Sequence, residues 1–309
     1  MTSDPASLDP RSELSEFLRT RRARLQPEEV GLPYFGARRR VPGLRREELA
    51  QLAGVSVAYY TRLEQGNAHN VSASVLEAIA DALRLNPAER KHLDHLVKPA
   101  RQRARAVPTR PQRVRPQLQF LLDSMDTVPA YILGRRCELL AWNRMACALL
   151  GALGALPPEQ RNFAWMVFMD PAAHEFYDDW ESKARDVVSC LRMDAGRTPD
   201  DPKLAALIGE LSVKSPEFRQ WWAAHDVRST GPCQKELHHP VVGRLSLAFE
   251  AMVLPADPDQ QLITYAAEPG SASAESLRLL ASWAAEPNPG QGPGAMTEGT
   301  RPEQARTAD

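Results

Sequence analysis

The stretch of residues 43–66 constrains the fold of this chain more than any other, and it reads G-L-R-R-E-E-L-A-Q-L-A-G-V-S-V-A-Y-Y-T-R-L-E-Q-G. Around Gly54 it divides into two segments whose apolar residues recur every three or four positions, the spacing of an amphipathic helix. Ser56 stands where an N-cap hydroxyl would accept from free amides, and Gly66 where a helix leaves through a left-handed residue. Two capped helices joined by a tight turn predict a helix-turn-helix; an ordinary helical hairpin with solvated charges is the alternative.

Periodicity assigns each predicted helix an inward face, made of Leu44, Leu49, Leu52 and Ala53 in the first and of Val57, Tyr60 and Leu63 in the second. A helix-turn-helix presents its second helix to the major groove of DNA. The residues expected to face DNA there are Ser56, Val57, Ala58, Tyr59, Thr61 and Arg62. Only Arg62 carries a guanidinium fork that pairs with a guanine edge, so we expect direct base reading to depend mainly on it.

Charge is divided unequally along the chain. Residues 1–115 contain 21 Lys and Arg against 13 Asp and Glu, a net charge of +8, whereas the remainder contains 17 against 26, a net charge of −9. A polyanionic partner is therefore expected at the N-terminal half alone. Within that half, the residues expected to contact phosphates or a minor groove are Arg38, Arg39, Arg40, Arg45 and Arg46, although a basic run is also typical of a solvated face.

A helix over residues 12–25 is expected to precede this motif. Its inward residues are Leu14, Phe17, Leu18 and Leu25, and its outward residues are Arg19, Arg21 and Arg24. Arg22 could contact a phosphate or form an ion pair with Glu64 at the end of the recognition helix, and we favour the ion pair.

Two more helix starts follow the motif. Ser74-Val75-Leu76-Glu77 predicts a helix through residue 83, and Asn86-Pro87-Ala88-Glu89 predicts another to about residue 97. These complete a five-helix DNA-binding domain at 12–98, after a disordered leader at 1–11 and before a basic, proline-punctuated linker at 99–116. His69 and Asn70 are loop residues or phosphate donors, and the sequence leaves that choice open.

Residues 117–285 are predicted to form an α+β domain. The expected helices lie at 118–125, 143–150 with Asn143 as its cap, 173–194, 202–213, 216–224 and 273–283. The expected strands lie at 130–133, 137–141, 245–254 and 261–268, with a turn at 255–259. A small antiparallel sheet with helices on one side would bury a second core. The tail at 286–309 is rich in Pro, Gly and Ala and is expected to be disordered.

Several classes of protein are disfavoured by the sequence. No apolar run approaches 18 residues and the N-terminus lacks a basic and apolar leader, so we expect a cytoplasmic, nucleoid-associated protein without membrane contact. The four cysteines have no short pair, which favours buried thiols over a zinc knuckle or disulfides, with a redox sensor as the alternative. His238 and His239 would point to opposite faces of a strand, so no metal site is expected. The sequence shows neither a nucleophile elbow nor a phosphate-binding glycine loop, so we do not expect an enzyme. No cofactor is expected either.

The motif of residues 43–66 closely resembles the XRE-type helix-turn-helix of bacterial regulators, and the longer pattern resembles the MmyB-like transcription regulators. The likeness continues in N-F-A-W-M-V-F-M-D-P at 162–171, D-W-E at 179–181, S-P-E-F at 215–218, H-P-V-V-G at 239–243 and A-E-P-G-S at 267–271. It covers about residues 12–283. The resemblance implies a PAS-like ligand-binding domain that follows the helical domain and binds a fatty-acid-like molecule.

Aromatic residues concentrate in this second half, as they do in ligand pockets and also in dry cores. The predicted ligand-binding set is Trp142, Asn143, Phe163, Trp165, Phe168, Phe176, Trp180, Arg192, Phe218, Trp222, His239 and Phe249. Arg192, Asn143 and His239 are the candidates for contacting an acyl carboxylate.

The leading hypothesis is a transcriptional regulator that binds a double-stranded DNA operator as a homodimer and senses a hydrophobic, fatty-acid-like effector. The alternative is a DNA-bound regulator whose second domain is a protein-docking or dimerisation module without a small ligand. An enzyme with a DNA-binding appendage is a third class, which the motifs disfavour.

Overall fold

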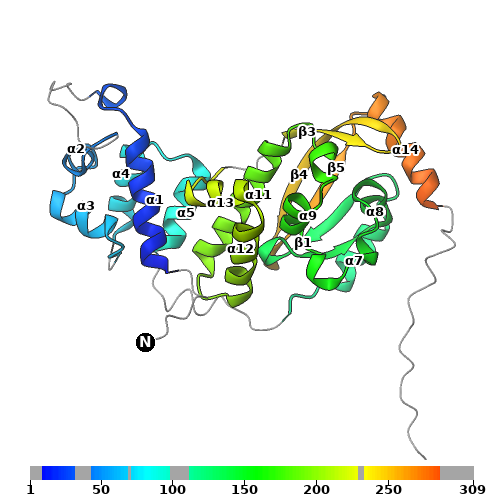
Figure 1. Cartoon of the computed structure of the whole chain (residues 1–309), viewed down its shortest axis with the longest axis horizontal. Coiled ribbons are helices and arrows are strands. Elements are labelled where there is room, and N and C mark those ends of the chain that lie inside the picture. Colours follow the sequence, from blue (N-terminus) through cyan, green and yellow to red (C-terminus); the bar gives the residue numbers. More distant parts are fainter. Residues whose placement is uncertain (1–8, 32–42, 69–70, 98–110, 229–232, 286–309) are drawn as a thin grey trace, which may run out of the picture.

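The computed structural model of the chain describes residues 9–31, 43–68, 71–97, 111–228 and 233–285. Figure 1 shows the N-terminal helices as one lobe and the sheet with its helices as a second lobe, in which α11, α12 and α13 lie on the side that faces the first. The N-terminal lobe contains α1 (Pro10–Arg24), the short 3-10 helix η1 (Pro27–Val30), α2 (Arg46–Leu52), α3 (Val57–Glu64), α4 (Ala73–Ala82) and α5 (Pro87–Val97). The five predicted α-helices of this lobe are therefore present.

Local capping chemistry explains most of these helix boundaries. The Ser56 hydroxyl accepts from the Tyr59 amide at 3.1 Å, as predicted. Asn86 and Glu89 each accept from the other's backbone amide at 2.9 Å, which confirms the second predicted capping box. The predicted cap at Ser74 is wrong: Ser72 is the N-cap of α4, because its hydroxyl accepts from the Val75 amide.

The inward faces are corrected at three positions. Leu52 was expected to be buried, but it is 36% exposed, and Ala50 packs inside instead. Val57, which was assigned both to the inward stripe and to the residues that face DNA, is 43% exposed. Arg21 was expected to point outward, yet it is buried, because α1 lies against the second lobe as well as against the other helices of the N-terminal lobe. α1 also begins at Pro10 rather than at residue 12, since the Asp9 carboxylate caps it.

The second lobe contains more elements than the sequence predicted. Its helices are α7 (Pro116–Asp123), α8 (Arg144–Leu150), α9 (Phe163–Met169), α10 (Ala173–Phe176), α11 (Trp180–Arg197), α12 (Pro202–Lys214), α13 (Pro216–Ala223) and α14 (Ala272–Ala285), with the 3-10 helices η2 (Arg135–Cys137), η3 (Leu153–Ala155) and η4 (Pro158–Gln160). Its strands are β1 (Ala130–Leu133), β2 (Leu139–Trp142), β3 (Cys233–His239), β4 (Gly243–Leu254) and β5 (Asp257–Ala266). α9 and β3 were not predicted as elements.

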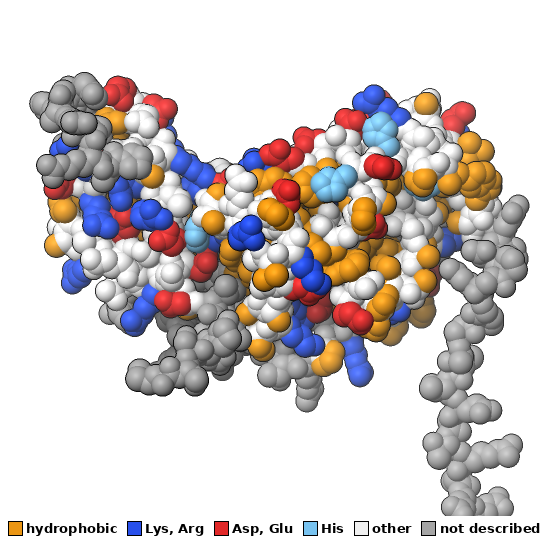
Figure 2. All heavy atoms as spheres, viewed as in Figure 1, with side chains coloured by type: hydrophobic (Ala, Val, Ile, Leu, Met, Phe, Trp, Pro, Cys, Tyr) orange, Lys and Arg blue, Asp and Glu red, His pale blue; other side chains and the backbone are white. Residues whose placement is uncertain are grey.

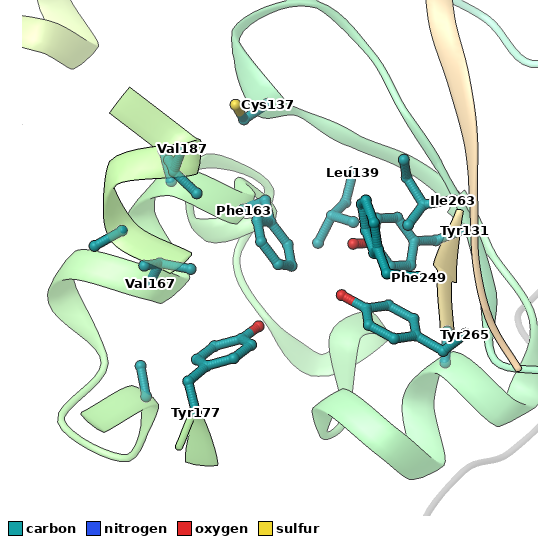
Figure 3. Packing of buried hydrophobic residues seen from close by; sticks show 14 of the residues in the cluster. Tyr131, Cys137, Leu139, Phe163, Val167, Tyr177, Val187, Phe249, Ile263 and Tyr265 are labelled. Atoms are coloured by element: carbon teal, nitrogen blue, oxygen red, sulfur yellow. The ribbon is translucent and has the colours of Figure 1, made fainter. Parts of the chain in front are cut away.

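The strands form one antiparallel sheet in the order β2-β1-β5-β4-β3, which gives the PAS-like α+β arrangement. One face carries Tyr131, Phe249 and Tyr265 toward α9 and α11, and Figure 3 shows this core from close by. The other face packs Ala130 and Ile132 against Leu122 of α7, so helices cover both faces rather than one. The main core therefore lies between the sheet and the helices that lead to the N-terminal lobe.

The predicted single helix over 173–194 is interrupted. The backbone at Tyr177 bridges Leu237 of β3, and the Asp178 amide donates to the Glu236 carbonyl at 3.2 Å. Because this pairing uses extended backbone, α10 ends at Phe176, and Asp179 caps a new helix, α11. The break positions α11 to run from the core of the second lobe to the junction between the lobes.

Candidate functional site

The N-terminal part of α3 forms an exposed surface. Ala58 and Arg62 are exposed beside Val57, while Tyr59 and Thr61 are half-buried. The Arg62 guanidinium lies 6.0 Å from the centroid of the Tyr59 ring, which limits the directions in which it can reach. Tyr60 and Leu63 on the opposite side are buried and hold α3 against the other helices. The residues predicted to face DNA therefore share one accessible side of the helix.

A buried ion pair fixes the far end of α3. Arg22 Nη2 donates to Glu64 Oε1 at 2.7 Å, which confirms the predicted pairing, and Arg22 Nη1 donates to the Leu44 carbonyl at 2.5 Å. Arg46 Nε also donates to Glu64, at 3.0 Å, although the Arg46 side chain is 46% exposed. Arg46 is thus partly engaged inside the protein, whereas Arg45 is exposed at the start of α2.

Basic side chains gather on the N-terminal lobe in Figure 2, and hydrophobic ones gather on the second lobe where α9 lies. Arg38, Arg39 and Arg40, together with His69 and Asn70, lie outside the described residues.

A pocket of about 680 Å³ opens in the second lobe, within the range typical of small-molecule sites. Its walls come from the end of α8, from α9 and α10, and from the turn between β3 and β4. The apolar lining includes Leu149, Leu150, Phe163, Met166, Val167, Ala173, Phe176, Tyr177 and Val241. Two exposed carboxylates, Asp170 and Glu175, stand at its rim. The pocket can hold a small apolar molecule.

Three of the predicted ligand residues line this pocket: Phe163, Phe176 and His239. The other aromatic residues lie elsewhere. Phe168, Trp180, Phe218 and Trp222 pack with Trp221 between α9, α11 and α13. Trp142 lies under the Arg161 guanidinium, Trp165 is half-buried on α9, and Phe249 packs on Tyr265 in the main core. Their packing is that of a protein core rather than of a pocket lining.

None of the three predicted carboxylate partners is available to a ligand in this pocket. Asn143 caps α8 and donates to the carbonyls of Met125 and Val128 at 3.0 and 2.8 Å. His239 Nδ1 accepts from the Val241 amide and Nε2 bonds to the Ala148 carbonyl at 2.9 Å, while burial lowers its pKa, so the ring is neutral at pH 7. Arg192 lies away from the pocket, at the junction of the lobes.

Most of the pocket residues outside the predicted set are aliphatic or lie in turns, and Tyr177 is an aromatic residue that the set also lacks. Leu149, Met166 and Val167 resemble ordinary core residues in a sequence, and only the fold brings them together. Asn162 could have indicated the start of α9 in the sequence, because asparagine is a common N-cap. Its side chain caps the helix by accepting from the Ala164 and Trp165 amides.

The cysteines and histidines have structural settings. All four cysteines are free; Cys137 is buried, and a hydrogen bond with Cys190 together with burial raises its pKa. Cys233 is exposed at the start of β3, so the expectation of a buried thiol is wrong there. His238 is exposed and bonds to Asp178, opposite in direction to buried His239, as predicted for neighbours on a strand. Within the described ranges, His, Cys, Asp and Glu form no cluster of three suited to a metal ion.

Residues 114–280 match the model of the MmyB-like transcription regulator ligand binding domain, and residues 13–93 match a helix-turn-helix domain model. The chain belongs to the MmyB-like transcription regulators. It is therefore a DNA-binding transcription regulator with a ligand-binding domain. Comparison with curated proteins finds no match. In the part of the chain that the structure describes, no helix is both long and apolar enough to cross a membrane.

Within this MmyB-like regulator, the two matched regions divide the chemistry. The helix-turn-helix match contains α3 and its exposed Arg62. The ligand-binding match contains the whole lining of the 680 Å³ pocket. Both matched domains are domains of transcription regulators.

Proposed function

We propose that this MmyB-like regulator binds a specific operator as a homodimer and that a hydrophobic, fatty-acid-like effector in the pocket between α8, α9 and the β3–β4 turn controls this binding. The observation that carries the proposal is the pocket, which is lined mainly by aliphatic and aromatic side chains. A pocket of this kind favours a small-molecule sensor over the alternative of a protein-docking module, which needs no such cavity.

A continuous chain of contacts supports control of the N-terminal lobe by the pocket. Phe168 neighbours the pocket-lining Val167 on α9, and its ring lies 5.1 Å from that of Phe218. Phe218 stacks on Trp222 at 5.7 Å, and the Arg192 guanidinium lies 4.1 Å above Trp222. Arg192 Nη1 then donates to Glu13 of α1 at 2.8 Å. An effector that shifts α9 would change how the lobes dock, and thereby the DNA affinity.

Recognition of the DNA bases is proposed to depend on Arg62, while the methyl groups of Val57, Ala58 and Thr61 contact thymine. These are few polar contacts for a specific site. Arg38, Arg39 and Arg40, together with DNA shape, are therefore proposed to supply much of the recognition.

The experiment is operator selection from a random DNA library, followed by affinity measurement at several salt concentrations. Arg62→Ala should relax the preference at one base position by roughly 1–3 kcal/mol. Replacing Arg38 to Arg40 by Ala should instead weaken binding to all DNA and flatten the salt dependence. Arg90→Ala is the matched control, because Arg90 pairs with Glu77 and Asp81 on the helices behind α3. Identical, sequence-independent losses from both sets of variants would contradict the assigned roles.

A further inference from the structure

Lys183 of α11 is a buried cation in the core of the ligand-binding domain. Only 6% of the surface of Lys183 is exposed. The ammonium lies among three aromatic rings, 4.6 Å from the centroid of Phe163, 5.2 Å from Phe249 and 5.6 Å from Tyr177. Burial, and then the nearby Lys235, lower its pKa to about 8, so most of it remains charged at neutral pH. Aromatic rings stabilise a cation less than hydration by water does, so burying the ammonium at this site costs free energy.

No carboxylate among the described residues pairs with Lys183, which has neither an ion pair nor a hydrogen bond there. The acids around it are engaged elsewhere: Asp186 with Lys235, Asp178 with His238, Asp179 with the Ser182 amide, and Glu236 with Ser246. Residues 229–232, which lead into β3, read S-T-G-P and contain no acid. Lys235 is thus paired with Asp186, whereas Lys183 has no ion pair of its own within the described segments.

The space beside Lys183 connects with the pocket. Phe163 and Tyr177, two of the three rings around the ammonium, also line the 680 Å³ pocket. Tyr177 lines in addition a smaller cavity of about 150 Å³ whose walls include Lys183. Tyr177 therefore borders both spaces, and a ligand that reached from the pocket to the lysine would have to pass its side chain.

The hydroxyl groups of three tyrosines surround the same space. Figure 3 shows the hydroxyls of Tyr131, Tyr177 and Tyr265 pointing into the region between Phe163 and the sheet. The Tyr265 hydroxyl makes no hydrogen bond of ordinary geometry, although Tyr131 lies beside it. Burial raises the pKa of each of these phenols, so they remain neutral donors. A buried hydroxyl without a hydrogen-bond partner among the described residues, next to a cation without an ion pair there, forms a site suited to an anion.

We propose that Lys183 is the counter-ion for the carboxylate of an acyl-chain acid, which inserts head first and leaves its tail toward the pocket mouth. The inference rests on the proposed hydrophobic effector and assigns its head group and orientation. The opposite orientation would place the carboxylate near Asp170 and Glu175 at the rim, where like charges repel it.

The test measures binding of decanoate and decanol, which share a chain and differ in the head group, to the full-length protein by calorimetry. The wild type should bind decanoate at least about tenfold more tightly than decanol, because only the carboxylate satisfies the buried ammonium. Lys183→Met should weaken decanoate binding at least about tenfold and leave decanol within about threefold. Lys214→Met is the matched control: it makes the same change at an exposed residue of α12 and should alter neither affinity.

The remaining outcomes separate the failures. Equal binding of decanoate by the wild type and Lys183→Met would overturn the role of Lys183, while the hydrophobic effector would stand. An equal loss of both ligands in a folded Lys183→Met protein would also overturn it, because the head group would then be irrelevant. If the wild type bound neither molecule, the proposed hydrophobic effector itself would fail, and the assignment of Lys183 with it.

Discussion

His92 of α5 lies against the edge of the Phe17 ring, with a centroid distance of 5.1 Å, and none of its surface is exposed. Neither ring nitrogen has a hydrogen-bond partner among the described residues. Burial, followed by the charges of Arg192, His95, Arg21 and His225, lowers the pKa of His92 well below 6.5. The folded protein therefore holds this ring in its neutral form.

This burial makes stability depend on pH. Below about pH 6.5 the unfolded chain takes up a proton at His92 that the folded chain refuses, so the free energy of unfolding should fall as the pH falls. One such group contributes up to about 1.4 kcal/mol per pH unit. His92→Leu should remove this part of the slope when urea unfolding is followed by circular dichroism from about pH 7.5 to about pH 5. A slope that is the same in the variant would show that His92 is protonated in the folded state.

At the scale of elements, the exit from α3 depends on a glycine for two reasons. Gly66 has a φ of +84°, in the left-handed region that side chains disfavour. A Cβ at this position would also lie 2.6 Å from the Arg11 carbonyl oxygen, because the start of α1 crosses there. The sequence suggested the first reason, and only the packing of α1 supplies the second.

The two reasons can be separated by measurement. Gly54→Ala tests the backbone alone, since Gly54 has a φ of +65° and nothing lies within 4 Å of its Cβ position. It should cost about 1–2 kcal/mol of stability. Gly66→Ala should cost at least about 2 kcal/mol more, because α1 or α3 must also move. If urea unfolding showed the same loss of stability for both variants, α1 would move away from the new Cβ at no cost in free energy.

For the whole molecule, the junction between the lobes is built from buried charge. Arg192 is completely buried, and its Nη1 lies 2.8 Å from both Glu13 Oε2 and His225 Nδ1. Burial raises the pKa of Glu13, but the neighbouring His225 ring and the charge of Arg192 outweigh it, so the pKa is lowered overall. Arg21 adds an ion pair with Glu89 at 2.8 Å and a hydrogen bond to the His225 carbonyl. Removing one member of such a buried pair would leave the other charge buried without a partner. The docking of the lobes therefore depends on both members of each pair.

A double-mutant cycle measures this docking. Glu13→Gln and Arg192→Met should each destabilise the full chain, and the double variant should recover about 2 kcal/mol relative to the sum of the single losses. The control cycle uses Glu210→Gln and Lys214→Met, an exposed pair on α12, where the coupling should be below about 0.5 kcal/mol. If the Glu13–Arg192 coupling were no larger than that of the control pair, the proposed route from the pocket to α1 would lose its last step.

The sequence alone determined the features that depend on neighbours within a few residues. Ser56, the Asn86–Glu89 box and Asn143 act as caps as predicted, because a cap and its amides lie on one short segment. The predicted strand pairs β1–β2 and β4–β5 are also present, since short connections join their partners. The helix-turn-helix was readable for the same reason: its turn, caps and exposed residues all lie within residues 43–66.

The tertiary structure decided which side chains are buried and which of them meet. Arg192 and Glu13 are 179 residues apart, so no local pattern could turn a predicted ligand contact into a junction between lobes. The split between α10 and α11 likewise depends on β3, which follows some 60 residues later. The pocket and the unpaired Lys183 arise from the same cause: burial is set by contacts between distant segments, whereas sequence periodicity shows only that a residue has an inward side.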